Sequence, residues 1–183
     1  MSQERHRLRV LTTLLFTDIA GSTEHAALLG DRRWLDVLNA HDELIREEVR
    51  GHGGNVIKLL GDGALATFGA PSPALAAAES ISTRALDELG LGIRSGVHSG
   101  ECDLVTGDVR GLAVHVGARV AELAAPGEVL MTGTVADLLI GAGHDLADRG
   151  ERVLRGVPGR WRMLALRALA GTIAPVGTLS EAA

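Results

Sequence analysis

The strongest constraint on the fold is a pair of short apolar segments, residues 55–60 and 64–68, separated by Gly61-Asp62-Gly63. Glycine and aspartate favour tight turns, so this pattern predicts a β-hairpin with Asp62 at its tip. An earlier segment, residues 9–17, is rich in Val, Leu, Thr and Phe, and predicts a buried strand that ends beside Asp18. Each of these two strand segments therefore carries one carboxylate at its end.

The remaining pattern alternates between helices and strands. The helix that follows Gly21 is expected to use Ser22 or Thr23 as its N-cap and to pause at Gly30-Asp31. Apolar periodicity and Gly or Pro breaks predict a helix that follows Pro73 and runs to about residue 89, and further helices at 112–123 and 134–140. They also predict strands at 91–98, 101–105 and 128–132, and a hairpin between 145 and 168. This order predicts an α+β fold, a mostly antiparallel sheet with helices packed on it.

The composition is that of one globular domain. The chain has 183 residues, 46% hydrophobic and 22% charged, so it can bury a real core. We expect the domain to span 10–168, with flexible ends at 1–9 and 169–183. The net charge is −5 and no dense Lys/Arg run occurs, which argues against a nucleic-acid partner. We recognise no signal peptide and no apolar run of membrane-spanning length, and the single Cys102 fits a reducing compartment. We therefore expect a cytoplasmic protein without membrane contact.

The polar residues at the strand ends suggest a site for nucleotide phosphates. Asp18 and Asp62 each lie beside a glycine turn, and Mg²⁺ usually takes one or two protein carboxylates together with substrate phosphates. A third stretch adds the carboxylate of Asp108 and then the guanidinium of Arg119 on the following helix. The three stretches together predict a site for a metal-bound nucleotide.

Four motifs in this order resemble the catalytic domain of class III nucleotidyl cyclases, in particular the bacterial branch. They are Phe-Thr-Asp-Ile-x-Gly-Ser-Thr at 16–23, Lys-x-x-Gly-Asp-Gly at 58–63, Arg-x-Gly-x-His-x-Gly at 94–100 and Asp-x-x-Gly-x-x-Val-x-x-x-x-Arg at 108–119. The resemblance covers about residues 10–167 and implies the ferredoxin-like, palm-type cyclase fold. It implies an adenylyl cyclase that converts ATP to 3′,5′-cyclic AMP and pyrophosphate.

The resemblance also implies roles for individual residues. Asp18, Asp62 and the backbone carbonyl of Ile19 would bind two divalent metal ions, Mg²⁺ or Mn²⁺. The backbone of Gly21-Ser22-Thr23 would hold the triphosphate at a helix N-terminus, where free N–H groups favour anions.

The purine-selecting positions of the family fall on Lys58 and Asp108, the pair typical of adenylyl cyclases, and the transition-state arginine falls on Arg119. His115 replaces the usual asparagine that orients the ribose, and we expect it to act in catalysis. In the family the metal aspartates of one subunit face the lysine, aspartate and arginine of the other. The resemblance therefore implies a homodimer with two head-to-tail composite sites.

Simpler interpretations exist for each residue. Asp62 can be a plain turn residue, and Arg119 with Glu122 can be a solvated ion pair on a helix. For the whole chain, one alternative is a catalytically weak or regulatory dimerisation module, for which His115 is the only support. Another is a diguanylate cyclase, but that family's Gly-Gly-Asp/Glu-Glu-Phe signature does not occur in the sequence.

Overall fold

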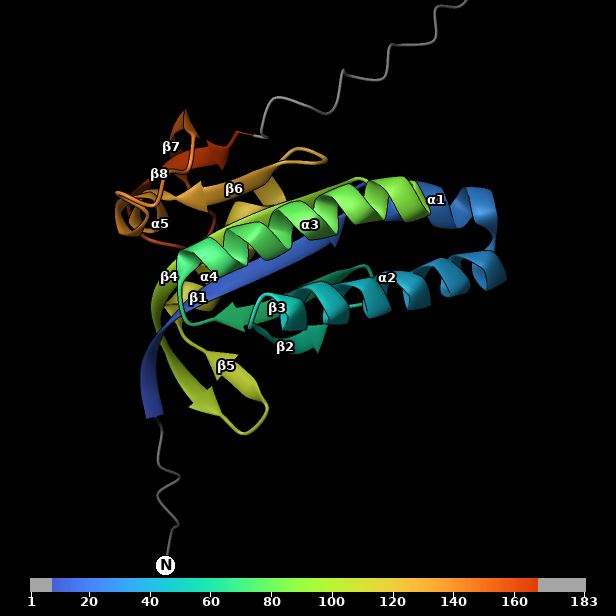
Figure 1. Cartoon of the computed structure of the whole chain (residues 1–183), viewed down its shortest axis with the longest axis horizontal. Helices are drawn as coiled ribbons and strands as arrows, with labels where there is room; N and C mark the ends of the chain where they lie inside the picture. The colour runs from blue at the N-terminus through green and yellow to red at the C-terminus, as the bar shows by residue number, and fades with distance from the viewer. Residues whose placement is uncertain (1–7, 168–183) are drawn as a thin grey trace, which may run out of the picture.

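The computed structural model describes residues 8–167, which form one eight-stranded sheet with helices on both faces (Figure 1). The strands are β1 (Leu8–Ile19), β2 (Asn55–Leu59), β3 (Gly63–Phe68), β4 (Ile93–Val105), β5 (Asp108–Arg110), β6 (Val129–Thr132), β7 (Leu146–Val153) and β8 (Arg160–Leu166). The helices are α1 (Ser22–Leu29), α2 (Asp31–Gly51), α3 (Pro71–Leu89), α4 (Leu112–Leu123) and α5 (Gly133–Leu138).

The sheet is mostly antiparallel, as the sequence predicted. Its strand order is β2-β3-β1-β4-β6-β8-β7, and β5 pairs with β4 as a hairpin arm. Within residues 8–167 only β4 and β6 run parallel. Because β1 and β4 pair antiparallel, the last residues of β1 and the first residues of β4 lie side by side, next to the β2–β3 turn.

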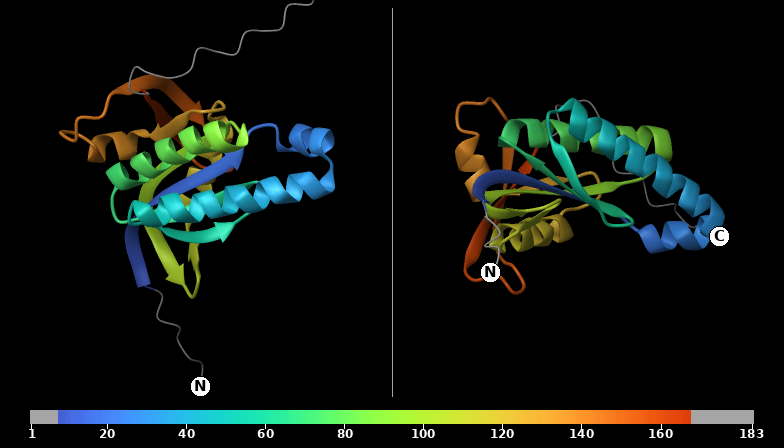
Figure 2. Two further views of the ribbon diagram at one scale, coloured as in Figure 1. Left: turned by 45° about the vertical axis from the view of Figure 1, so that its right-hand side comes forward. Right: turned by 90° about the horizontal axis from the view of Figure 1, so that it is seen from below.

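Two helical layers cover the sheet. Helices α2 and α3 lie on one face, and α4 lies on the other (Figure 2, right). Side chains of a strand alternate between faces, so Leu14 and Phe16 of β1 pack in the cluster under α4, whereas Leu15 and Ile19 pack in the larger core under α2 and α3. Burial on both faces explains the consecutive apolar residues Leu14, Leu15 and Phe16 in the middle of β1.

Helix α4 lies unusually close to β4. The closest approach is at Gly96, where a Cβ atom would collide with the backbone of Ala121. Glycine therefore lets the helix sit directly on the strand. This contact fixes the position of the residues that α4 carries.

Two boundaries differ from the prediction. The strands expected at 91–98 and 101–105 are one strand, β4, because β1 is long enough to pair with it from Ile93 to Leu104 without a break. Strand β1 begins at Leu8, so Leu8 and Arg9 belong to the sheet and not to the segment expected to be flexible. The rest of that segment and the expected tail at 169–183 lie outside the described residues. Among the helices of residues 8–167, none combines the length and apolar character needed to cross a membrane.

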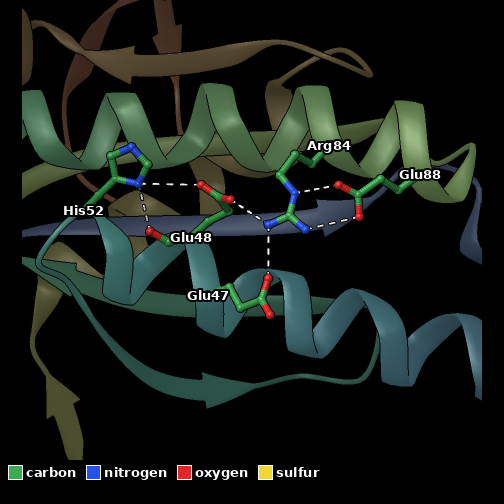
Figure 3. A network of polar contacts seen from close by, with 5 residues as sticks. All are labelled: Glu47, Glu48, His52, Arg84 and Glu88. Atoms are coloured by element: carbon green, nitrogen blue, oxygen red, sulfur yellow. Dashed lines mark hydrogen bonds and ion pairs between the residues drawn. The ribbon is translucent and has the colours of Figure 1, made fainter.

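A network of charged side chains joins α2 to α3 (Figure 3). Arg84 of α3 donates hydrogen bonds to Glu47 at 3.2 Å, to Glu48 at 2.7 Å and to Glu88 at 2.6 and 3.1 Å. A ring nitrogen of His52 lies 2.8 Å from the carbonyl oxygen of Glu48 and 3.7 Å from its carboxylate. One guanidinium thus links three carboxylates from two helices.

Candidate active site

The structure brings Asp18 and Asp62 together in one pocket of about 320 Å³. Asp18 lies near the end of β1, and Asp62 lies in the turn between β2 and β3. The N–H of Ile19 donates a hydrogen bond of 2.9 Å to the carbonyl oxygen of Asp62, which holds the turn against the strand end. The pocket is also lined by Phe16, Thr17, Leu60, Gly63, Arg94, Ala118, Ala121 and Glu122. Its volume is sufficient for a small-molecule site.

Arg94 lies directly opposite Asp18 on the neighbouring strand. Its Nη2 is 2.5 Å from the Oδ2 of Asp18. Burial raises the pKa of Asp18, the guanidinium of Arg94 lowers it and the charge of Asp62 raises it again, so the net pKa lies above the ordinary value. Burial is the largest cause of this raised pKa, and the nearby carboxylate of Asp62 adds to it.

The segment that follows β1 turns sharply into α1. Gly21 has φ +67°, a left-handed conformation that glycine adopts readily, and it is the N-cap residue. The expectation that Ser22 or Thr23 is the N-cap is therefore wrong. The hydroxyl of Ser22 instead donates to Oδ2 of Asp62 at 2.5 Å, so it serves the pocket and does not cap the helix. No side chain caps the first N–H groups of α1, and Thr23 is exposed.

Lys58 and Asp108 form a second centre outside that pocket. Lys58 Nζ, on β2, lies 2.7 Å from Oδ1 of Asp108, on β5, and the N–H of Val109 donates to the same oxygen at 2.8 Å. The hydrogen bond from Lys58 lowers the pKa of Asp108, and the hydrogen bond from Val109 lowers it further. The sequence-predicted base-selecting residues are thus side by side, with a lysine donor next to a carboxylate acceptor.

Arg119 and His115 lie on the outer side of α4. The inner side of α4 is made of the buried residues Ala113, Val116, Gly117, Val120 and Ala121. Arg119 forms an ion pair with Glu122 three residues later, the contact that the simpler interpretation predicted, and His115 is exposed. Neither Arg119 nor His115 lines the aspartate pocket, although Glu122 does. Within one chain, the predicted transition-state arginine therefore lies outside the pocket that contains the predicted metal ligands.

The aspartate pocket fits a hard divalent cation that completes its coordination with phosphate or water oxygens. Within residues 8–167 no group of three or more His, Cys, Asp or Glu side chains has a metal-binding arrangement. Mg²⁺ characteristically needs only one or two carboxylates beside substrate phosphates. Asp18 and Asp62 supply that number.

Sequence reasoning gave no role to two residues of the pocket, Arg94 and Glu122. Arg94 stands in one of the quoted motifs, but only the register between β1 and β4 reveals that it faces Asp18. Glu122 was considered only as a partner of Arg119. Its place in the pocket wall depends on how α4 packs against β4, which no local pattern shows.

Comparisons with known proteins identify the family. The model of the adenylate and guanylate cyclase catalytic domain matches residues 9–168. The chain therefore belongs to the class III adenylyl and guanylyl cyclase domains. A relative, the uncharacterised protein Rv0891c of Mycobacterium tuberculosis, is 31% identical over 151 residues, which are 80% of this chain and 52% of the relative. The chain spans about a quarter to a half of the length of the curated relatives that it matches.

Solved structures agree with this assignment. A monomeric adenylate cyclase of Trypanosoma brucei is 27% identical, with a TM-score of 0.79 over 90% of this chain and 92% of the other. The guanylate cyclase domain of RhGC from Catenaria anguillulae, solved with GTP, has a TM-score of 0.78 over 86% of this chain and 96% of the other. Its identity is 18%, so this likeness concerns the fold alone. Both adenylyl and guanylyl cyclases thus share the fold.

Proposed function

We propose that this domain is an adenylyl cyclase, which converts ATP to 3′,5′-cyclic AMP and pyrophosphate. The observation that carries the proposal is the Lys58–Asp108 pair, in which Nζ of Lys58 lies 2.7 Å from Oδ1 of Asp108. Adenine carries an amino donor and ring-nitrogen acceptors, so Asp108 can accept from the amino group while Lys58 donates to a ring nitrogen. Guanine has the reverse pattern at these atoms and would leave both side chains unmatched, which is costly in a closed site.

Asp18, Asp62 and the carbonyl of Ile19 would hold two divalent cations, Mg²⁺ or Mn²⁺. Such a pair of ions stabilises the charge on both the attacking and the leaving oxygen of an in-line displacement. Arg94 points its guanidinium at the same pocket and can pair with phosphate oxygens. The uncapped N–H groups after Gly21 provide a further place for a phosphate, because they carry the positive end of the helix dipole.

The reaction is an internal displacement and needs no covalent bond to the protein. The ribose 3′-oxygen forms a bond to the α-phosphorus, the bond from that phosphorus to the pyrophosphate oxygen breaks, and the 3′-hydroxyl proton leaves to solvent. Arg119 would pair with the charge that develops on the α-phosphate, where a bidentate guanidinium is well suited. His115 lies one turn before Arg119 and could orient the ribose by a hydrogen bond.

The separation of Arg119 from the aspartates favours composite sites. A head-to-tail homodimer would bring Lys58, Asp108 and Arg119 of one subunit to Asp18 and Asp62 of the other, and its twofold axis would create two equal sites. The alternative is a catalytically weak regulatory module. His115, at the position where the family usually has asparagine, is the observation that favours it.

The decisive experiment incubates the purified protein with ATP or GTP in the presence of Mn²⁺ or Mg²⁺ and measures the cyclic products. We expect cyclic AMP in clear excess over cyclic GTP. Cyclic GTP as the main product would refute the role given to Lys58 and Asp108. No product with either nucleotide, from a protein that is folded and dimeric, would favour the regulatory module.

A further inference from the structure

Glu122 contacts two parts of the site that otherwise do not meet. Its carboxylate accepts a hydrogen bond from Nη1 of Arg119, and its side chain lines the pocket of Asp18 and Asp62. Arg119 itself is outside the pocket. Glu122 is thus the link between the guanidinium and the aspartates of one chain.

This link has a particular meaning if the sites are composite. The aspartates of a chain would then serve one active site of the dimer, and Arg119 of the same chain would serve the other. A charge that touches both therefore lies between two active sites. This step rests on the proposed function, and specifically on its dimeric form.

We propose that Glu122 is a positioning residue whose carboxylate changes its partner from Arg119 to a divalent cation. It pairs with Arg119 while the aspartate pocket holds no cation, and it turns to the pocket when a cation binds beside Asp18 and Asp62. Arg119 is then free to bind the phosphates of a nucleotide. Cation binding in one site would in this way prepare the arginine of the opposite site.

The contacts make the exchange feasible. Arg119 has only Glu122 as an ion-pair partner among the described residues, and 56% of the Glu122 side chain is exposed, so the carboxylate can move without opening the core. The pair is solvent-accessible, and such pairs contribute little net free energy, so a doubly charged ion nearby can outcompete the guanidinium. Glu122 comes from α4 and already lines the pocket wall, so its carboxylate is at hand for a cation bound there.

The test uses Glu122→Gln and two binding measurements at low ionic strength. Mn²⁺ binding without nucleotide, followed by calorimetry, should weaken about threefold, because the pocket loses a nearby negative charge. Binding of a fluorescent ATP analogue in the presence of EDTA should become about threefold tighter, because Arg119 is free from the start. A purely structural role for the pair would not move these two affinities in opposite directions.

The matched control is Glu151→Gln. Glu151 is also 56% exposed and also pairs with an arginine, Arg160, at 2.7 Å, but on the β7–β8 hairpin. It should change neither affinity. In an Arg119→Ala background, Glu122→Gln should still weaken Mn²⁺ binding and should no longer tighten the binding of the analogue.

The outcomes separate this inference from the proposed function. Unchanged affinities in Glu122→Gln, a fall in both, or a wild-type protein that binds no Mn²⁺ would overturn the role of Glu122. Cyclic AMP production is measured in the same wild-type preparation. Its absence would count against the cyclase proposal, while the two opposite binding changes, with the tightening lost in the Arg119→Ala background, would still support the exchange. Tightening that persists without Arg119 would be a simple charge effect and would overturn it.

Discussion

Two arginine-centred clusters in this molecule are built differently. Arg84, between α2 and α3, is bonded to three glutamates at once (Figure 3). In the candidate active site, by contrast, the guanidiniums of Arg94 and Arg119 each have one carboxylate partner among the described residues. The Arg84 cluster holds α2 and α3 together, and the loss of one glutamate partner would not free its guanidinium. The arrangement in the candidate site leaves most donors of each guanidinium available.

The difference shows how arginine–carboxylate pairs can either hold helices together or leave an arginine able to bind a ligand. A guanidinium has five N–H donors, and a cluster that uses many of them leaves few for a ligand. A guanidinium with one partner can trade that partner for a phosphate at little net cost, because the lost contact is replaced by a stronger one. We therefore propose that Arg94 and Arg119, which are singly paired and lie at the candidate site, are ligand-binding groups, and that Arg84 is a structural group. The following predictions test this division.

The largest effect is expected from Asp18→Asn, which removes the carboxylate from the Arg94 pair. Production of cyclic AMP should fall about a thousandfold, because metal stabilisation of the reacting phosphate is worth several kcal/mol. Folding should be kept, as judged by circular dichroism and dimer size. Activity near that of the wild type with both Mg²⁺ and Mn²⁺ would remove Asp18 from the metal site.

The same variant also has a predicted effect on stability. The pKa of Asp18 is raised, so the folded protein disfavours its charged form at neutral pH. Asp18→Asn should therefore melt at a higher temperature than the wild type at pH 7 without metal. The gap should close as the pH falls through the raised pKa of Asp18, because the wild-type carboxyl is then neutral as well. A lower melting temperature for the variant at pH 7 would contradict the assigned direction.

The next largest effect is expected from the double change Lys58→Glu with Asp108→Cys. It removes both adenine partners, and unmatched polar groups in a closed site should lower kcat/KM for ATP by about tenfold to a hundredfold. The matched control exchanges another cross-strand pair in the same way, Arg162→Glu with Asp148→Cys, whose members lie 2.8 Å apart on β8 and β7. An unchanged preference for ATP in the Lys58 and Asp108 variant would show that the base is recognised elsewhere.

A smaller change in activity is expected when two inactive variants are mixed. It distinguishes active sites shared between two subunits from active sites within one chain. Asp18→Ala and Arg119→Ala should each be inactive alone. After subunit exchange, about half of the dimers are mixed and each has one intact site, so the mixture should regain about a quarter of the wild-type activity. Subunits labelled with two fluorophores report the exchange. Proven exchange without recovered activity would rule out the head-to-tail arrangement.

The sequence predicted much of the architecture because local patterns carry it. The hairpin around Asp62 and helix α4 have strong periodicity and clear glycine signals, and both were placed within a residue or so. The continuous β4 was missed, since its continuity comes from pairing with β1 and not from its own residues. Ser22 was misjudged for a related reason: its hydroxyl is used by Asp62, which is distant in sequence.

The candidate site was predictable only where a family motif contains it. Asp18, Asp62, Lys58 and Asp108 follow from the motifs, and the structure places each pair together. That Arg94 faces Asp18 could not be predicted, because it depends on the register between β1 and β4. That Glu122 contacts both Arg119 and the pocket could not be predicted either, because it depends on how α4 packs on β4. The same limit applies to the Arg84 network, which joins two helices that have no patterned relation in the sequence.

The smallest effect on activity is expected from Arg84→Met, which completes the comparison. Methionine keeps much of the side-chain length but leaves Glu47, Glu48 and Glu88 without their shared cation, so like charges face one another between α2 and α3. The melting temperature should fall by about 2–4 °C at low salt, and the difference should shrink at high salt because the network is solvent-accessible. Turnover of ATP at 25 °C should equal that of the wild type, since the network joins α2 to α3 on one face of the sheet and the aspartate pocket is lined by α4 on the other. Arg84→Lys, which restores one charge but not the forked geometry, should recover only part of the stability.

Loss of turnover in Arg84→Met without a change in melting temperature would show that a multiply paired arginine can also be functional. The number of carboxylate partners would then not distinguish structural from ligand-binding arginines.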